Sequence, residues 1–344
     1  MGRARRIVTD MTTVAQVRLT RVDDEADLRA WFEVGAAAVA HDRPGDPPRS
    51  WAGLVSELTR PWPGRDVERW LARSDGDAVA ALRLALPNRD NLSSALVECE
   101  VAPAQRRRGL GRALLAHAAD RARTQGRTRL IVEVRTGGPG DALMRALGAR
   151  PALRDQRRRL PLPPADPAAL AAMEAAAVAA SPGHTLVGWT GTTPDDHLDD
   201  IARLAAQMST DTPLDDLHSE PETYDADRVR EADAASVGHG MVPLVTAARV
   251  GVDGPLVAYT TVFHRAETPW HASQGDTLVE SAHRGHRLGV RVKLANLARL
   301  QAHAPQVTAV DTWNADSNPW MVSINEAMGF RPYDAWTEWE LDLV

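Results

Sequence analysis

The chain repeats one arrangement of glycines, and this repeat restricts the folds open to it more than any other feature. In the first half, Gly111 lies at the start of an expected helix and Gly148 at the end of a later one. In the second half, Gly289 and Gly329 take the same places, 178 and 181 residues further on. Two landmarks at nearly equal offsets indicate two copies of one structural unit. The length of 344 residues is also that of two ordinary domains.

The first copy places a cationic loop between a strand and a helix. An apolar strand is expected over 94–101, and a helix with apolar residues at Leu110 and Leu114 follows the loop. Gly109 and Gly111 allow the backbone to approach a ligand closely, and the N–H groups at a helix N-terminus attract phosphate. Four arginines add positive charge: Arg106, Arg107, Arg108 and Arg112. The loop is therefore predicted to bind a pyrophosphate.

The spacing Arg106-x-x-Gly109-x-Gly111 resembles the acetyl-coenzyme A signature of the Gcn5-related N-acetyltransferases (GNAT), Gln/Arg-x-x-Gly-x-Gly/Ala. It differs from a P-loop, which carries a Lys-Ser/Thr pair, and from Gly-x-Gly-x-x-Gly. The strand before the loop and the strand expected over 129–134 also resemble this family. The resemblance implies acetyl-CoA as co-substrate, held by these residues: Val101, Arg106, Arg107, Arg108, Gly109, Leu110, Gly111, Arg112 and Ala113.

The expected elements of the first half follow the order β-α-α-β-β-β-α-β-α-β, which is that of the acetyltransferase fold. The whole chain resembles tandem GNAT proteins of the actinobacterial type, with mycothiol synthase as a distant relative in architecture. The predicted fold class is α/β, an α+β mixed sheet in two tandem acyl-CoA N-acyltransferase domains. We expect a disordered extension over 1–11, an N-terminal domain over 12–160, a Pro/Ala-rich linker and helix over 161–184, and a C-terminal domain over 185–344.

Composition excludes several classes of protein. The net charge of −6 argues against a general nucleic-acid binder, which usually has a basic excess. Cys99 is the single cysteine, so the chain forms no intrachain disulfide and no multi-cysteine metal site. No apolar run reaches membrane-spanning length, and the N-terminus lacks the hydrophobic segment of a secretory signal. We expect a cytoplasmic, metal-free monomer or homodimer that binds neither membranes nor nucleic acid.

The second cationic loop, His283-Arg-Gly-His-Arg-Leu-Gly289, departs from the family pattern. When Gly289 is aligned with Gly111, Arg287 takes the place of Gly109, so a side chain stands where pyrophosphate would approach. This possible second cofactor site is expected to bind more weakly; its residues are Arg284, Gly285, His286, Arg287, Leu288, Gly289 and Asn318. His283 and His286 have no third ligand in register, so zinc is not expected.

Acetyl transfer to an amine needs a base for the amine proton and a donor for the developing oxyanion. Glu98 and Glu100 share one face of the strand at period two, and either is a candidate base. The alternative is a surface-facing pair. Asp276 and Glu280 are weaker candidates in the second half. Neither copy has the tyrosine that commonly protonates the leaving thiolate in this family, because Met144 and Asn325 stand at its offset, so the general acid stays open.

Residues 195–233 contain 13 Asp or Glu and three Arg, and in the repeat they cover the acceptor side. Such a wall would attract a cationic amine, although a solvated acidic surface has the same composition. The resemblance implies transfer of acetyl from acetyl-CoA to a primary amine of a small molecule, by family analogy an antibiotic or specialised metabolite. The alternatives are an active C-terminal half, as in mycothiol synthase, and a non-catalytic acyl-CoA-binding or sensor module.

Overall fold

The computed structural model describes residues 17–343, so the extension predicted for 1–11 lies outside the described residues. The first copy of the unit comprises β1 (Arg18–Arg21), α1 (Glu25–Asp42), α2 (Trp51–Thr59), β2 (Arg65–Ser74), β3 (Asp77–Pro87), β4 (Ser94–Val101), α3 (Leu110–Thr124), β5 (Arg129–Arg135), α4 (Pro139–Leu147) and β6 (Arg150–Pro161). This order of elements is the predicted one.

After α5 (Pro167–Ala180), the second copy comprises β7 (His184–Thr190), α6 (Leu198–Asp211), α7 (Ala226–Gly238), β8 (Met241–Val250), β9 (Leu256–Arg265), β10 (His271–Val279), α8 (Leu288–His303), β11 (Ala309–Ala315), α9 (Pro319–Met328) and β12 (Arg331–Asp342). The element order is the same as in the first copy, which confirms the repeat. A 3-10 turn over Asp195–His197 comes directly before α6.

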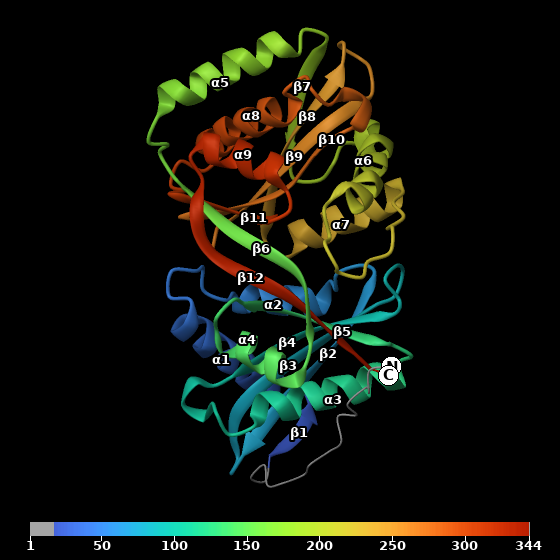
Figure 1. Ribbon diagram of the computed structural model, residues 1–344, viewed down its shortest axis with the longest axis vertical. Helices are drawn as coiled ribbons and strands as arrows, with labels where there is room; N and C mark the ends of the chain where they lie inside the picture. The colour runs from blue at the N-terminus through green and yellow to red at the C-terminus, as the bar shows by residue number, and fades with distance from the viewer. Residues whose placement is uncertain (1–16, 344) are drawn as a thin grey trace.

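The twelve strands of residues 17–343 form one mixed sheet, in the order β1-β2-β3-β4-β5-β12-β6-β11-β10-β9-β8-β7. The last strand of each copy crosses to the other copy. β12 pairs antiparallel with β5 of the first half, and β6 pairs antiparallel with β11 of the second. β6 and β12 also pair with each other and so join the two halves into a continuous sheet (Figure 1).

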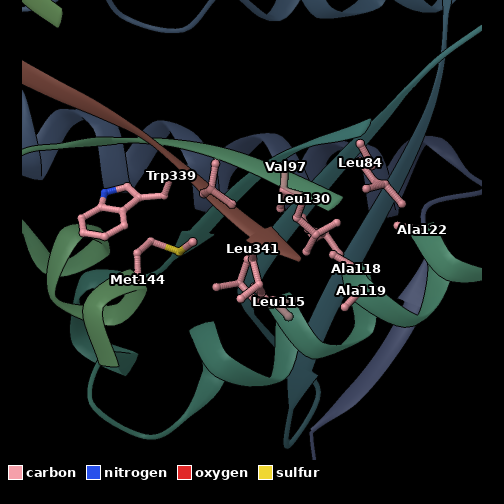
Figure 2. Packing of buried hydrophobic residues seen from close by; sticks show 14 of the residues in the cluster. Leu84, Val97, Leu115, Ala118, Ala119, Ala122, Leu130, Met144, Trp339 and Leu341 are labelled. Carbon is pink, nitrogen blue, oxygen red and sulfur yellow. The ribbon is translucent and has the colours of Figure 1, made fainter. Parts of the chain in front are cut away.

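The exchanged strand β12 completes the core of the first half. Leu341 of β12 lies beside Leu115 of α3 and Leu130 of β5, and Trp339 of β12 lies beside Met144 of α4 in the same core (Figure 2). Trp339 is 1% exposed and is the largest fully buried side chain of the described chain. The strand β12, near the C-terminus, therefore belongs to the core of the first half, whose other elements end some 180 positions earlier in the sequence.

The helices cover the two faces of the sheet in the same way in both halves. In the first half α1 packs against Leu71 and Ala81, while α3 packs against Leu82 and Leu84 on the opposite face. From the strand register, the side of the sheet that α1 and α2 cover in the first half is the same side that α6 and α7 cover in the second half. None of the described helices is long and apolar enough to cross a membrane.

One charged side chain interrupts the core of the second half. Lys293 of α8 is 1% exposed, and its ammonium nitrogen lies 5.6 Å from the centroid of the Phe330 ring. The equivalent position of the first copy, 178 residues earlier, is the buried Leu115. The nitrogen is buried and makes no hydrogen bond with the described residues. Burial lowers the pKa of Lys293 from 10.5 to about 7, because an apolar surrounding disfavours the charged form.

The substitution Lys293→Met is expected to stabilise the protein by about 5 kcal/mol at pH 6, since a shift of one pKa unit corresponds to about 1.4 kcal/mol. The folded-state pKa lies below the unfolded-state pKa, so the unfolded wild type binds more protons between pH 7 and 10.5. Wild-type stability therefore rises with pH across this window, and the advantage of the variant shrinks. Urea denaturation at pH 6 and pH 10 measures both values; a less stable variant at pH 6 would contradict the prediction.

Candidate functional site

In each half, two parallel strands pair only over their first residues. Ser94–Leu96 of β4 pairs with Arg129–Ile131 of β5, and the pairing then stops although β4 continues to Val101. In the second half the same happens after Ser273 of β10. Beyond this point the backbone groups of the two strands no longer bind each other, which leaves room for a ligand between their carboxyl ends. The cationic loops follow directly after β4 and β10.

The two loops have the same backbone course although their glycines differ. Each begins with a 3-10 turn and an extended arginine, Arg106 (φ −66°, ψ 163°) or Arg284 (φ −66°, ψ 161°). Both then need two left-handed residues. Arg107 (φ 66°) and Gly109 (φ 83°) supply them in the first loop; Gly285 (φ 84°) and Arg287 (φ 54°) supply them in the second. The glycine takes the second left-handed position in the first loop and the first left-handed position in the second loop. This explains why the sequence of the second loop departs from the family pattern although its backbone is the same.

The first arginine of each loop anchors the loop to the preceding helix. Arg106 donates two hydrogen bonds of 2.7 Å to Asp42 at the end of α1, and a third, of 3.2 Å, to the carbonyl of Val101. Arg284 bonds the carbonyl of Val279 and Asp211, at the end of α6, in the same way. Burial alone would raise the pKa of Asp42, but hydrogen bonds from Arg106 and His41 outweigh it and lower the pKa. The guanidinium of Arg106 is thus already bound within the protein.

The remaining predicted residues of the first loop divide into exposed cations and packed residues. Arg107, Arg108 and Arg112 are exposed, and none has a carboxylate within 4 Å among residues 17–343. Leu110 is buried in the core, so it presents its backbone to the loop, and Val101 and Ala113 are partly buried. A Cβ on Gly111 would lie 2.9 Å from Leu143 of α4, so Gly111 allows α3 and α4 to pack closely.

The second-loop residues are distributed similarly. Gly285, His286 and Arg287 are exposed, whereas Leu288 and Gly289 are buried at the start of α8. The side chain of Asn318 accepts a hydrogen bond from Met321 and caps α9. No group of histidine, cysteine or acidic residues in the described part of the chain has a geometry that could hold a metal ion.

The candidate carboxylates of the first half lie on the α1/α2 face of β4, as their spacing predicts. Glu98 accepts a 2.8 Å hydrogen bond from Arg83, and Glu100 lies 3.4 Å from Arg49. Burial raises the pKa of Glu100, and Arg49 offsets this only in part. Glu280 of the second half is held by Arg203 at 2.6 Å. Asp276, 178 residues after Glu98, has a pKa raised by burial.

Three further carboxylates lie on the same face, and the sequence interpretation missed them. Glu133 of β5 pairs in register with Glu338 of β12, and Asp155 follows on β6. We call these three residues and Glu98 the acidic cluster. Among residues 17–343, no cationic group lies within 4 Å of Glu133, Glu338 or Asp155. The alternation of each strand marks these residues as facing away from the core, but the sequence holds no signal that β12 lies beside β5.

The surroundings of the acidic cluster raise the pKa values of its members. Solvent reaches the side chain of Glu133, yet the protein around it limits hydration, and its pKa rises to about 7 through this desolvation and repulsion from Asp155 and Glu98. Desolvation and the charge of Glu133 likewise raise the pKa of Glu338 to about 7. Desolvation and Asp316 raise that of Asp155 to about 6. Carboxylates with such values exchange protons near neutral pH.

The fold, the diverging parallel strands and the glycine–arginine loops define an acyl-CoA-type acyltransferase, and sequence comparison agrees. The family model described as the acetyltransferase (GNAT) family matches residues 36–147. A solved tandem GNAT protein from the clavulanic acid biosynthesis pathway is 31% identical, with a TM-score of 0.77 over 96% of this chain and 99% of that chain. The chain belongs to the GNAT family as a tandem member, and it is an N-acetyltransferase.

Two more distant structures share the fold. A GCN5-related N-acetyltransferase from Sphaerobacter thermophilus is 17% identical, with a TM-score of 0.65 over 95% of this chain and 96% of that chain. A GCN5-related glucosamine N-acetyltransferase region of a fungal β-N-acetylglucosaminidase is 12% identical, with a TM-score of 0.67 over 95% of this chain and 38% of that one. No curated protein sequence matches the chain.

Proposed function

We propose that the protein transfers the acetyl group of acetyl-CoA to a primary amine of a small cationic molecule, and that the first loop holds the co-substrate. One observation carries this proposal. Where β4 parts from β5, the exposed cations of the first loop follow the end of β4, while the acidic cluster lies on β4, β5 and the neighbouring strands β12 and β6. A polyanion and a cationic amine would therefore be attracted to neighbouring places.

The first loop fits the phosphates of acetyl-CoA. Gly109 is left-handed and precedes Leu110, so the first N–H groups of α3 are free of intrahelical partners and border the exposed Arg107 and Arg108. Arg106 would contribute indirectly, because its hydrogen bonds to Asp42 and Val101 hold the loop in this conformation. When bound, acetyl-CoA supplies an activated acetyl thioester. Backbone N–H groups near Val101, at the end of β4, would stabilise the oxyanion, as the family resemblance implies.

The acidic cluster would select the acceptor and take its proton. An ammonium group would bind among these carboxylates by direct charge pairing, because no arginine or lysine of the described residues lies within 4 Å of Glu133 or Glu338. A carboxylate with a pKa near 7 can then accept the amine proton, directly or through water. We extend the acceptor class to specialised metabolites, because the similar tandem protein comes from the clavulanic acid pathway.

The substitution Glu133→Gln tests this assignment. We expect kcat/KM for a responsive amine to fall at least about 10-fold at pH 7, within the range of general-base effects. Wild-type activity should rise with pH through about 7, because the protonated pair cannot accept a proton. In the variant, loss of the neighbouring charge lowers the pKa of Glu338, so the remaining activity should titrate at lower pH. Thiol release measured from pH 5.5 to 9 gives both values.

Glu174→Gln, on the exposed face of α5, is the matched control and should leave the pH profile unchanged. An unaltered profile in Glu133→Gln would remove the acidic cluster from the reaction.

A second candidate is an active C-terminal half. The second loop keeps the backbone of the first, and β10 has an irregular register between Gln274 and Thr277, next to Asp276. Tyr259 faces Asp276 there, and burial raises the pKa values of both groups. Substitutions at the two equivalent loop positions, described in the Discussion, separate the two candidates.

A further inference from the structure

A pocket of about 400 Å³ lies between the two halves, and no residue of either cationic loop lines it. One wall is α2 with the loop before it; the other is formed by the first residues of β8 and β10 and the last residues of β9. On β10 the pocket meets His271 and Ser273, whereas the second loop follows Val279 at the far end of the strand. Its volume is that of a small-molecule site.

Arg265 gives this pocket an unneutralised positive charge. One of its terminal nitrogens donates a 2.6 Å hydrogen bond to the carbonyl of His239. Within residues 17–343, no carboxylate lies within 4 Å of its guanidinium, although Glu267 also lines the pocket. Burial lowers the pKa of Arg265, and the charge of Glu267 offsets this only in part. A partly desolvated guanidinium binds carboxylate or phosphate strongly, because little hydration is left to lose.

His271 adds a second polar group with a fixed orientation. Its Nε2 donates to Asp311 across 3.0 Å. Burial would raise the pKa of Asp311, but hydrogen bonds from Arg159 and His271 lower it to about 2, so this carboxylate is ionised. An ionised carboxylate only accepts hydrogen bonds, so Nε2 carries the proton of this contact and the Asp311 bond fixes the orientation of the imidazole ring.

The rest of the lining mixes apolar and polar side chains, and its apolar part includes two aromatic rings. Trp62 packs edge-on against the ring of His239, with 4.7 Å between ring centroids, and Phe263 lies on the opposite wall. Aromatic walls favour a flat apolar body, and the single free cation favours an acidic group on that body. We propose that this pocket binds a small organic anion with an aromatic or similarly flat body, whose acidic group pairs with Arg265.

An occupant of this pocket would also contact the acceptor side of the first half. Glu57 of α2 lines the pocket and accepts a 3.1 Å hydrogen bond from Arg83, which in turn donates to Glu98 of the acidic cluster. The pocket is thus connected to the candidate active site by two charged pairs, which suits a binding site for an effector.

Benzoate is the probe for this proposal, with benzamide as its neutral and benzylamine as its cationic counterpart. Titration is followed by ligand-detected NMR without acetyl-CoA, so the result does not depend on acetyl transfer. We expect benzoate to bind the wild type, to bind Arg265→Gln at least 10-fold more weakly, and to bind better than benzamide or benzylamine. Arg249→Gln is the matched control: Arg249 lies at the other end of β8 and also has no carboxylate within 4 Å among the described residues.

Should Arg265→Gln fail to fold, Ser273→Trp decides the question, because the indole would fill the pocket while Arg265 stays in place; benzoate binding should again be lost. Equal benzoate affinity in a folded Arg265→Gln or in Ser273→Trp would overturn the proposal. Equal binding of benzamide or benzylamine, or no binding of benzoate to the wild type, would also overturn it.

Discussion

Gly109→Trp is expected to abolish acetyl-CoA binding and to reduce turnover at least about 100-fold, a loss of about 2.7 kcal/mol in transition-state stabilisation. Gly109 is the left-handed residue just before α3, and an indole there would stand in front of the first N–H groups of the helix. The left-handed conformation adds a strain of about 1–2 kcal/mol, which a folded domain tolerates. Calorimetric titration of acetyl-CoA and a thiol-release assay measure the two effects.

Arg287→Trp is the matched control, because Arg287 has the same left-handed conformation at the same position of the second loop. It should retain binding and turnover if the first half carries the reaction. Loss of activity only in Arg287→Trp would place the co-substrate in the second half. No detectable acetyl-CoA binding to the wild type would overturn the proposed reaction.

Trp339→Ala should destabilise the protein by about 3–5 kcal/mol, the usual cost of removing a fully buried tryptophan. The cavity would open in the first half, where Trp339 lies in the same core as Leu115 and Leu130 (Figure 2). Amide hydrogen exchange should therefore accelerate in α3 before it does in α8, although residue 339 belongs to the second copy in sequence. Urea denaturation gives the size of the effect, and exchange gives its location.

Trp320→Ala provides the comparison, because Trp320 of α9 is 81% exposed and its removal should cost less than about 0.5 kcal/mol. Faster exchange in α8 with α3 unchanged would contradict the role assigned to β12.

The first glycine–arginine loop could be located from sequence because its signals are local. The left-handed Gly109, the cations beside it and the start of α3 all lie within seven residues, and each follows from the chemistry of its own residue. The role of Arg106 could not be read in this way. Its partner Asp42 is 64 positions away, at the end of a helix that only the folded chain brings to the loop.

The acidic cluster and the division of the core depended on long-range pairing. Glu133 and Glu338 are 205 positions apart, and each alone reads as an outward-facing residue of a strand. They become neighbours because β12 pairs with β5 rather than with its own copy. The division predicted at residues 161–184 follows the sequence repeat, while in the sheet each half passes its last strand to the other half across this division.

The sequence by itself determined the repeated order of elements, the family and the position of the first glycine–arginine loop, because periodicity, turn residues and glycine positions act over a few neighbouring residues. Only the tertiary structure decided which strand completes each half, which carboxylates meet without a cation, and where a pocket forms between the halves. Strand pairing follows the burial of whole faces such as that of Trp339, and burial depends on contacts between distant segments that local sequence does not encode.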